Sequence, residues 1–225
     1  MTHAGRIAGK RALDIATGGG HTAIALARAG ASVVAIDITY EMLDAASGFA
    51  SEQGVDIEFV QCAAESLSFD SDVFDLITCR IAPHHFADPQ KFVSEVFRVL
   101  VPGGRFLMID NITPVDTRLA DAMNEVEKRR DPSHVEAYSV HQWITWFVDE
   151  GFDPDLLIRW RKTKQFKEWT AMAQLPENEI DTLESDILDF SQRTRSYLRV
   201  KVRDGRIESL DHEAALFGAR HPPTG

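Results

Sequence analysis

The chain has 225 residues, of which 44% are hydrophobic and 26% are charged. These values are ordinary for soluble globular proteins, so they argue against intrinsic disorder, collagen-like repeats and low-complexity scaffolds. The length suits one domain. The 24 Lys and Arg residues and 35 Asp and Glu residues give a formal net charge of −11. Because nucleic acids and anionic membrane surfaces are bound mainly through clustered basic residues, we expect neither as a partner.

Targeting signals and cysteine pairs are not evident in the sequence. No apolar run approaches the roughly 20 residues that span a bilayer, and the first 16 residues lack the apolar segment of an export signal. The two cysteines, Cys62 and Cys79, form neither a disulfide framework nor a Cys-x-x-Cys pair. We therefore expect a cytoplasmic protein with no membrane insertion, no disulfide bond and no metal site.

The first 110 residues alternate short apolar runs with helical patterns. The runs predict strands at 11–16, 31–36, 57–60, 73–79 and 105–110, and the helical patterns predict helices at 21–28, 40–53 and 89–100. Strands that alternate with helices in this way form right-handed βαβ units. The pattern therefore predicts an α/β fold with an open, mostly parallel sheet and helices on both faces.

The pattern changes after residue 110. It predicts helices at 117–129, 140–150, 164–173 and 178–194, and strands at 155–163, 197–202, 206–210 and 214–219. Asp204 and Gly205 separate two of these strands and indicate a hairpin. We interpret the helices at 164–173 and 178–194 as a cap over the sheet.

A glycine turn between the first strand and the first helix is the first candidate ligand site. It follows Asp14 and includes Gly18, Gly19 and Gly20. Glycine lets a ligand approach the backbone closely, and a helix N-terminus offers unpaired N–H groups. A dinucleotide site would need a further glycine at a later position, which the sequence lacks. Asp14 would repel a pyrophosphate but can pair with an ammonium group, which favours a nucleotide that carries an amino acid.

Asp37 ends the second predicted strand, at the edge of the sheet where open α/β sheets bind ligands. A carboxylate at this position can accept hydrogen bonds from both hydroxyls of a ribose. The alternative is a turn carboxylate that caps the helix after Thr39. The presence of Asp14 on the neighbouring strand favours the ligand-binding interpretation.

These segments resemble the class I S-adenosylmethionine-dependent methyltransferases, and in particular the branch of ubiquinone and menaquinone biosynthesis. The resemblance covers about half of the chain and rests on Leu13 to Gly20, Asp37, Phe74 to Thr78 and Val99 to Gly104. It implies a Rossmann-like methyltransferase fold, with a mostly parallel seven-stranded sheet and a small helical cap inserted before the last strand.

The resemblance also implies a single domain, spanning residues 1–225, whose two halves bind different ligands. Residues 1–110 would form the cofactor-binding half. Residues 111–225 would form the substrate-side half, with the helical cap at about 164–196.

S-adenosyl-L-methionine is the implied cofactor, and the implied reaction is methyl transfer to an O, N or C atom of a small-molecule acceptor. A homodimer is a further possibility. The turn would hold the methionine part of the cofactor, and Asp37 would hold the ribose. The residues around them would contact the adenosine or lie at the mouth of the site. The implied cofactor residues are Asp14, Ala16, Thr17, Gly18, Gly20, Asp37, Ile38, Met42, Ala63, Ala64, Glu65 and Arg80.

His84 and His85 are the candidate catalytic residues, because they follow the fourth strand and imidazoles with near-neutral pKa values suit general-base catalysis. A histidine pair that only caps the next helix is the alternative, and we expect at most one of the two to touch the substrate. Arg130 and His134 are candidate substrate contacts, because similar methyltransferases line their pocket with the segment after the fifth strand. A solvated helix face is the alternative for that segment.

Three features depart from the family pattern. Ala16 stands where the family usually has glycine, which is tolerable if its φ angle is negative. Ala63 stands where many relatives have an aspartate that accepts a hydrogen bond from adenine, so reduced cofactor affinity is expected. The sequence starts 13 residues before Asp14, where relatives carry one or two helices. Either the late helices supply the cover or the chain begins further upstream.

Two other functions compete with methyl transfer. A non-catalytic S-adenosylmethionine-binding or regulatory protein would agree with Ala63 and the short start of the sequence. A nicotinamide oxidoreductase would share the fold, but the spacing of the glycines disfavours it.

Overall fold

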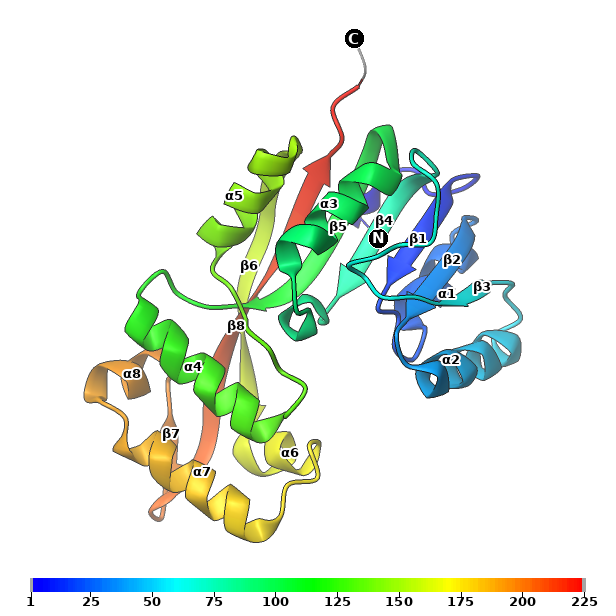
Figure 1. The fold of residues 1–225 in the computed structure, drawn as a ribbon. Helices are drawn as coiled ribbons and strands as arrows, with labels where there is room; N and C mark the ends of the chain where they lie inside the picture. Colours follow the sequence, from blue (N-terminus) through cyan, green and yellow to red (C-terminus); the bar gives the residue numbers. More distant parts are fainter. Residues whose placement is uncertain (1, 224–225) are drawn as a thin grey trace.

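The computed structural model of the protein describes residues 2–223, which contain one mixed sheet flanked by helices (Figure 1). The strand order is β3-β2-β1-β4-β5-β8-β6, and β7 pairs with β8. The strands are β1 (Arg11–Ile15), β2 (Ser32–Asp37), β3 (Glu58–Gln61), β4 (Phe74–Arg80), β5 (Leu100–Ile112), β6 (Asp153–Gln165), β7 (Lys201–Arg203) and β8 (Arg206–Arg220).

The first five strands run parallel, and β8 is antiparallel to β5, β6 and β7. The predicted α/β class is confirmed. The predicted number of strands is wrong by one, because the short β7 joins the seven strands of the main path.

Helices lie on both faces of the sheet, as the alternation of strands and helices predicts. They are α1 (His21–Arg28), α2 (Tyr40–Glu52), α3 (Pro89–Val99), α4 (Thr117–Arg130), α5 (Val140–Glu150), α6 (Phe166–Ala171), α7 (Glu177–Asp189) and α8 (Gln192–Tyr197), with 3₁₀ turns at Thr2–Ala4 and Pro83–His85. Figure 1 shows α3 and α5 in front of the sheet.

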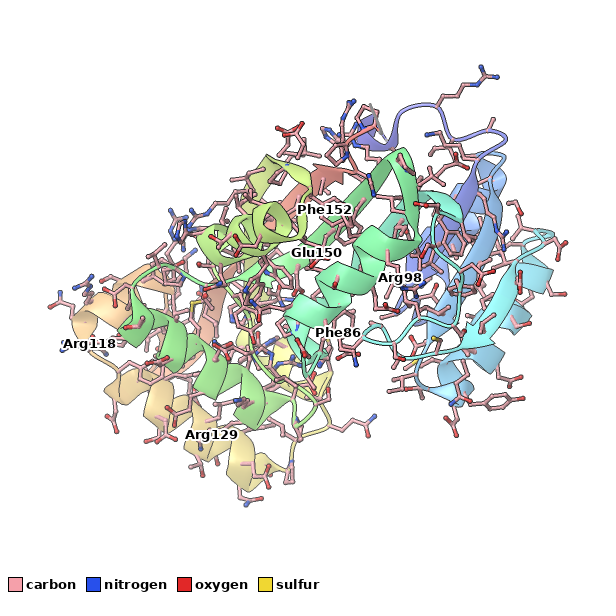
Figure 2. All side chains as sticks on the ribbon, turned by 45° about the horizontal axis from the view of Figure 1, so that its top comes forward. Phe86, Arg98, Arg118, Arg129, Glu150 and Phe152 are labelled. Carbon is pink, nitrogen blue, oxygen red and sulfur yellow. The ribbon has the colours of Figure 1, made fainter. Side chains whose placement is uncertain are left out.

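Successive side chains of a strand point to opposite faces, and β1 shows how this builds two cores. Leu13 and Ile15 belong to the main core, which also includes Phe92 of α3 and Phe147 of α5. Ala12 belongs to a second core with side chains of α1 and the first 3₁₀ turn. In Figure 2, Glu150 and Phe152 lie near Arg98 of α3. Glu150 accepts a hydrogen bond from Ser94, so α5 and α3 are joined directly.

The predicted elements of the last 60 residues need three corrections. The predicted helix at 178–194 is two helices, because the chain turns at Phe190 and Ser191 and Ser191 caps α8. Tyr197 ends that helix and lies outside the hairpin. The separate strands predicted at 206–210 and 214–219 are one 15-residue strand, β8, because its residues pair continuously with β6.

A third core lies under the cap helices, beside the extended halves of β6 and β8. Its buried side chains are Val126, Phe166, Trp169, Leu183, Ile187, Ile207 and Leu210. Val126 belongs to α4, so this helix joins the predicted cap segments α6, α7 and α8. In Figure 2, Arg118 and Arg129 mark the two ends of α4, and Arg129 pairs with Asp186 of α7.

A buried ionic group joins α4 to β8 and α6. Glu127 accepts hydrogen bonds from His212 Nδ1 at 2.7 Å and from Arg130 Nε at 2.8 Å. The Arg130 guanidinium lies 5.2 Å from the centre of the Trp169 ring. Burial by itself would raise the pKa of Glu127, but the hydrogen bonds and charges of His212 and Arg130 hold its pKa well below the ordinary 4.5.

Within residues 2–223, no helix combines the length and the apolar character that crossing a membrane requires.

Glu127→Gln is expected to lower the free energy of unfolding at pH 7.5 by about 3 kcal/mol, because removal of one partner leaves buried charges uncompensated. The lowered pKa of Glu127 means that its ionised form stabilises the fold above pH 4.5, and that this contribution is lost as the pH falls. Urea unfolding at pH 7.5 and pH 4 measures both effects. The control is Glu125→Gln, an exposed position on the same helix. Equal unfolding midpoints for the two variants would contradict the assignment.

Candidate active site

The turn between β1 and α1 has a left-handed backbone at several positions. The φ angles are +52° at Ala16, +52° at Gly18 and +78° at Gly20. A Cβ at Gly20 would lie 3.1 Å from Ala46 of α2, whereas a Cβ at Gly18 would meet nothing within 4 Å. The backbone at Gly18 is therefore open to a ligand.

The φ angle at Ala16 is positive, so the condition under which alanine would be tolerable at this position is not met. An L-residue in the left-handed region costs roughly 1–2 kcal/mol, which glycine avoids. The alanine is nevertheless held there, because the next residue, Thr17, donates its N–H to Ile36 O at 2.9 Å. The turn is thus strained at the position where the family usually has glycine.

Asp14 lies beneath this turn and is only 1% exposed. Its carboxylate accepts hydrogen bonds from Thr17 Oγ1 at 2.7 Å and from Thr78 Oγ1 at 2.6 Å. Burial raises the pKa of Asp14 to about 6, although both hydroxyls and the charge of Arg80 oppose the shift. Asp14 therefore contacts the turn through Thr17 rather than facing solvent.

Asp37 is 8% exposed and connects the turn to α2. Its Oδ2 accepts the Gly18 N–H at 2.9 Å, and its Oδ1 accepts the Thr39 N–H at 3.0 Å. The bond to Thr39 forms a turn before α2 but does not cap the helix, because Thr39 is itself the N-cap residue of α2. Each oxygen has one of these partners, so each retains capacity for a further donor.

Two large apolar side chains beside Asp37 are exposed. Ile38 is 68% exposed and Met42 is 49% exposed. The loop of the predicted adenine contacts lies close to the same strand end, because Cys62 N–H donates to Asp37 O at 3.0 Å.

In that loop Ala64 is buried, whereas Ala63 is partly exposed. The Glu65 carboxylate accepts the Ala87 N–H at 3.0 Å, so it holds the segment before α3.

The segment after β4 turns sharply before the two histidines. Arg80 ends the strand and is exposed, and Ile81 has a φ angle of +56°. Pro83, His84 and His85 form a 3₁₀ turn. In Figure 2, the next residue, Phe86, lies at the start of α3, between this helix and the cap.

His84 is 5% exposed and forms a short bond to Asp110 of β5. Its Nδ1 lies 2.6 Å from Asp110 Oδ1, while Asp110 Oδ2 is buried with no hydrogen-bond partner among the described residues. Burial disfavours the charged imidazole, but the charge and hydrogen bond of Asp110 outweigh burial and raise the pKa of His84 above 6.5. The pair is a buried histidine–carboxylate dyad.

His85 is held by a different set of groups and is partly exposed. Its Nδ1 lies 2.9 Å from Ser133 O and 3.1 Å from Ser133 Oγ. The Ser133 hydroxyl in turn donates to Asp131 at 2.6 Å. The His84 and His85 rings are 4.2 Å apart between centres.

His134 is the third imidazole of this cluster, with its ring centre 5.4 Å from that of His84. Its Nε2 donates to Asn124 Oδ1 at 2.9 Å. The Asn124 amide is oriented unambiguously, since Ala137 donates its N–H to the same Oδ1 and accepts from Nδ2 through its carbonyl. Burial, aided by the charge of His84, lowers the pKa of His134 to about 4, so this ring is neutral at physiological pH.

Of the candidate residues, the structure brings together His84, His85 and His134. Arg130 lies beside them, but its charge is already paired with Glu127 and Asp131. Asp110 and Asn124 were not among the predicted site residues. Asp110 had a usable signal, because it ends a predicted strand at the same sheet edge as Asp37, whereas Asn124 had none.

Among residues 2–223, no group of three or more His, Cys, Asp or Glu side chains is arranged to hold a metal ion.

Residues 13–108 match the family described as a methyltransferase domain. The uncharacterised methyltransferase YcgJ of Bacillus subtilis (strain 168) is 41% identical over 167 residues, which cover 74% of this chain and 66% of that protein. The crystal structure of YcgJ matches with a TM-score of 0.96 at 34% identity, covering 100% of this chain and 96% of that chain. The chain belongs to the S-adenosylmethionine-dependent methyltransferases. Its cofactor is therefore S-adenosyl-L-methionine.

Two further relatives are similar to most of this methyltransferase chain, and the second of them is named as a methyltransferase. The uncharacterised protein YafE of Escherichia coli (strain K12) is 32% identical over 76% of this chain and 83% of that protein. The demethylmenaquinone methyltransferase of Clavibacter sepedonicus is 33% identical over 71% of this chain and 66% of that protein. The predicted resemblance to the ubiquinone and menaquinone branch is thus confirmed.

Asp110→Asn in this methyltransferase is expected to lower the pKa of His84 below its wild-type value, because burial then acts without the opposing carboxylate charge. NMR titration of the imidazole C–H signals measures the shift. Asp121→Asn, at an exposed position on α4, is the matched control and is expected to change nothing. An unchanged His84 pKa in Asp110→Asn would refute the proposed control by Asp110.

Proposed function

We propose that this protein methylates a hydroxyl group of a small molecule, with His84 as general base and Asp110 as its positioning partner. The observation that supports this choice is the 2.6 Å bond between the two side chains. An ionised carboxylate only accepts hydrogen bonds, so His84 Nδ1 donates to Asp110. The neutral ring then has a free lone pair on Nε2, which no described residue occupies.

The cofactor supplies a methyl group on a positively charged sulfur, and the chain's own residues provide its binding site. The open backbone at Gly18 and the remaining capacity of the Asp37 carboxylate suit the methionine and ribose parts. The exposed side chains of Ile38 and Met42 offer an apolar surface beside them. The residues present therefore fit the cofactor. Asp14 supports this turn, because its carboxylate accepts a hydrogen bond from Thr17.

The proton of the acceptor hydroxyl moves to His84 Nε2, breaking the O–H bond as the N–H bond forms. Asp110 stabilises the resulting imidazolium and keeps the ring in one orientation, as carboxylates do in other histidine-based sites. Such a base typically contributes 10²- to 10⁴-fold. The remaining acceleration comes from holding the acceptor oxygen in line with the methyl group.

We assign the binding of the cofactor to residues 1–110 and most of the contacts to the acceptor to residues 111–225, with His84 reaching the acceptor hydroxyl from the first half. His134 and His85 border the base on its cap side, and the backbone supports this arrangement. Val135 N–H and Glu136 N–H both donate to His84 O, at 2.9 and 3.0 Å. The cap-side loop is thus bonded directly to the backbone of the proposed base.

Asp37→Ala is expected to weaken binding of S-adenosylhomocysteine about 10- to 100-fold, because the ribose loses a charged acceptor and a hydrogen bond to a charged group is worth roughly 1.5–3 kcal/mol. Isothermal titration measures the dissociation constant. Asp44→Ala, at an exposed position on α2, is the control. If both variants bind like the wild type, Asp37 is not a cofactor ligand.

His84→Gln is expected to lower kcat at least 100-fold while binding S-adenosylhomocysteine normally. Since the base must be neutral and the pKa of His84 is raised, the wild-type rate should increase with pH through an apparent pKa above 6.5. Release of S-adenosylhomocysteine is measured from pH 5.5 to 9 with a panel of phenols and hydroxy acids. A variant that keeps wild-type kcat and the same pH profile would exclude His84 as the base.

A further inference from the structure

The strand β6 forms one edge of the sheet. It is the last strand in the strand order, and Figure 1 shows it beside β8. In the part of the chain that the structure describes, no backbone hydrogen bond joins β6 to a segment other than β8. The N–H and C=O groups that point away from β8 therefore have no backbone partner there, along a strand of 13 residues.

This edge differs from the other edges of the sheet in length and in exposed apolar side chains. A short edge strand is a common protection against association, and β3 has 4 residues while β7 has 3. Every residue of β6 is at least partly exposed, and Leu156 and Ile158 are each 44% exposed. A long edge strand with exposed apolar side chains is a template for pairing with another strand.

One face of β6 carries charges at its two ends and apolar side chains between them. The residues of this face pair with every second residue of β8, from Arg220 back to Leu210, and therefore point to the same side of the sheet. The shift in register between Leu156 and Ile158 leaves Leu157 out of the series. In chain order the face carries Asp153, Asp155, Ile158, Trp160, Lys162 and Lys164.

This order is complementary to itself when a second copy of the strand runs in the opposite direction. In an antiparallel pair centred on Arg159, Asp153 lies opposite Lys164 of the second copy, and Asp155 lies opposite its Lys162. The apolar side chains in the middle of the face meet one another. Opposite charges and apolar pairs at directly opposite positions stabilise antiparallel strands.

The other face of β6 is compatible with the same pairing. Arg159 and Arg161 share that face, and both form ion pairs with Glu213 of β8. The Glu213 residue is 5% exposed. Its buried carboxylate partly offsets the positive charge of Arg159, which would otherwise repel the same residue of the second copy.

We propose that two copies of this protein associate through antiparallel pairing of their β6 strands, which joins the two sheets into one. Both copies contribute the same surface, as a two-fold symmetric interface requires. The partner is a second copy because β6 itself supplies both the acid and the base of every pair across the interface. The inference concerns a surface other than the methyl-transfer site and does not depend on the acceptor.

Sedimentation velocity of the full chain at low salt tests the proposal, because charge pairs are least screened there. The wild type is expected to be a dimer. Ile158→Lys places a charge on the edge and is expected to raise the dissociation constant of the dimer about 10-fold or more. Val202→Lys, at a 49% exposed position on β7, is the matched control and keeps the dimer. A monomeric wild type, or equal association of the two variants, would overturn the proposal.

An exchange of charge between Asp155 and Lys162 tests the direction and register of the pairing. Asp155→Lys alone brings two lysines opposite each other, and Lys162→Asp alone brings two aspartates together, so each variant is expected to be monomeric. An equal mixture of the two variants is expected to form dimers, because every such pair then joins Lys to Asp. Near-UV circular dichroism checks that each variant is folded. Folded variants that both remain dimeric, or a mixture that stays monomeric, would refute this antiparallel pairing.

Discussion

The hydrogen bond between Asp110 and His84 is the interaction on which the arrangement of this site depends. It joins the end of β5 to the turn that follows β4, and the carbonyl of His84 in turn accepts two N–H groups from the loop before α5. One buried contact therefore aligns two strand ends and the cap-side loop. Because Asp110 is fully buried, its charge is poorly screened by water and acts strongly on the one imidazole that it touches.

The histidines of the cluster lie in different environments, and this difference sets their pKa values. His84 gains a carboxylate and its pKa rises, whereas His134 gains only a neutral amide and its pKa falls to about 4. Positive charge on His84 adds to the second shift, because it disfavours charge on His134. Two titratable groups whose pKa values are pushed apart in this way suit different roles, which agrees with the proposal that His84 accepts the proton while His134 stays neutral.

Local sequence signals were sufficient to predict the strands and helices of the first half of the fold, but not those of the second half. The strands β1 to β4 are short apolar runs bounded by glycine or polar residues, so each is recognisable from its own neighbourhood. The length of β8 depends on continuous pairing with β6, which its own residues do not reveal. The contact between His84 and Asp110 is also not predictable from local sequence, because the two residues are 26 positions apart and meet only through the parallel pairing of β4 and β5. The positive φ angle of Ala16 likewise depends on how the turn is held against β2, which the local sequence does not reveal.

The family match covers only the first half of the chain, and its end lies close to the candidate site. The match ends at residue 108, two residues before Asp110, and so includes the glycine turn and Asp37 but neither Asp110 nor His134. The shared part thus supplies the structure around the cofactor, where every member handles the same molecule. The proposed base, His84, lies inside the matched segment, whereas its partner Asp110 and the helices α4, α6, α7 and α8 lie beyond it. Similarity within residues 13–108 therefore identifies methyl transfer and leaves the acceptor undefined.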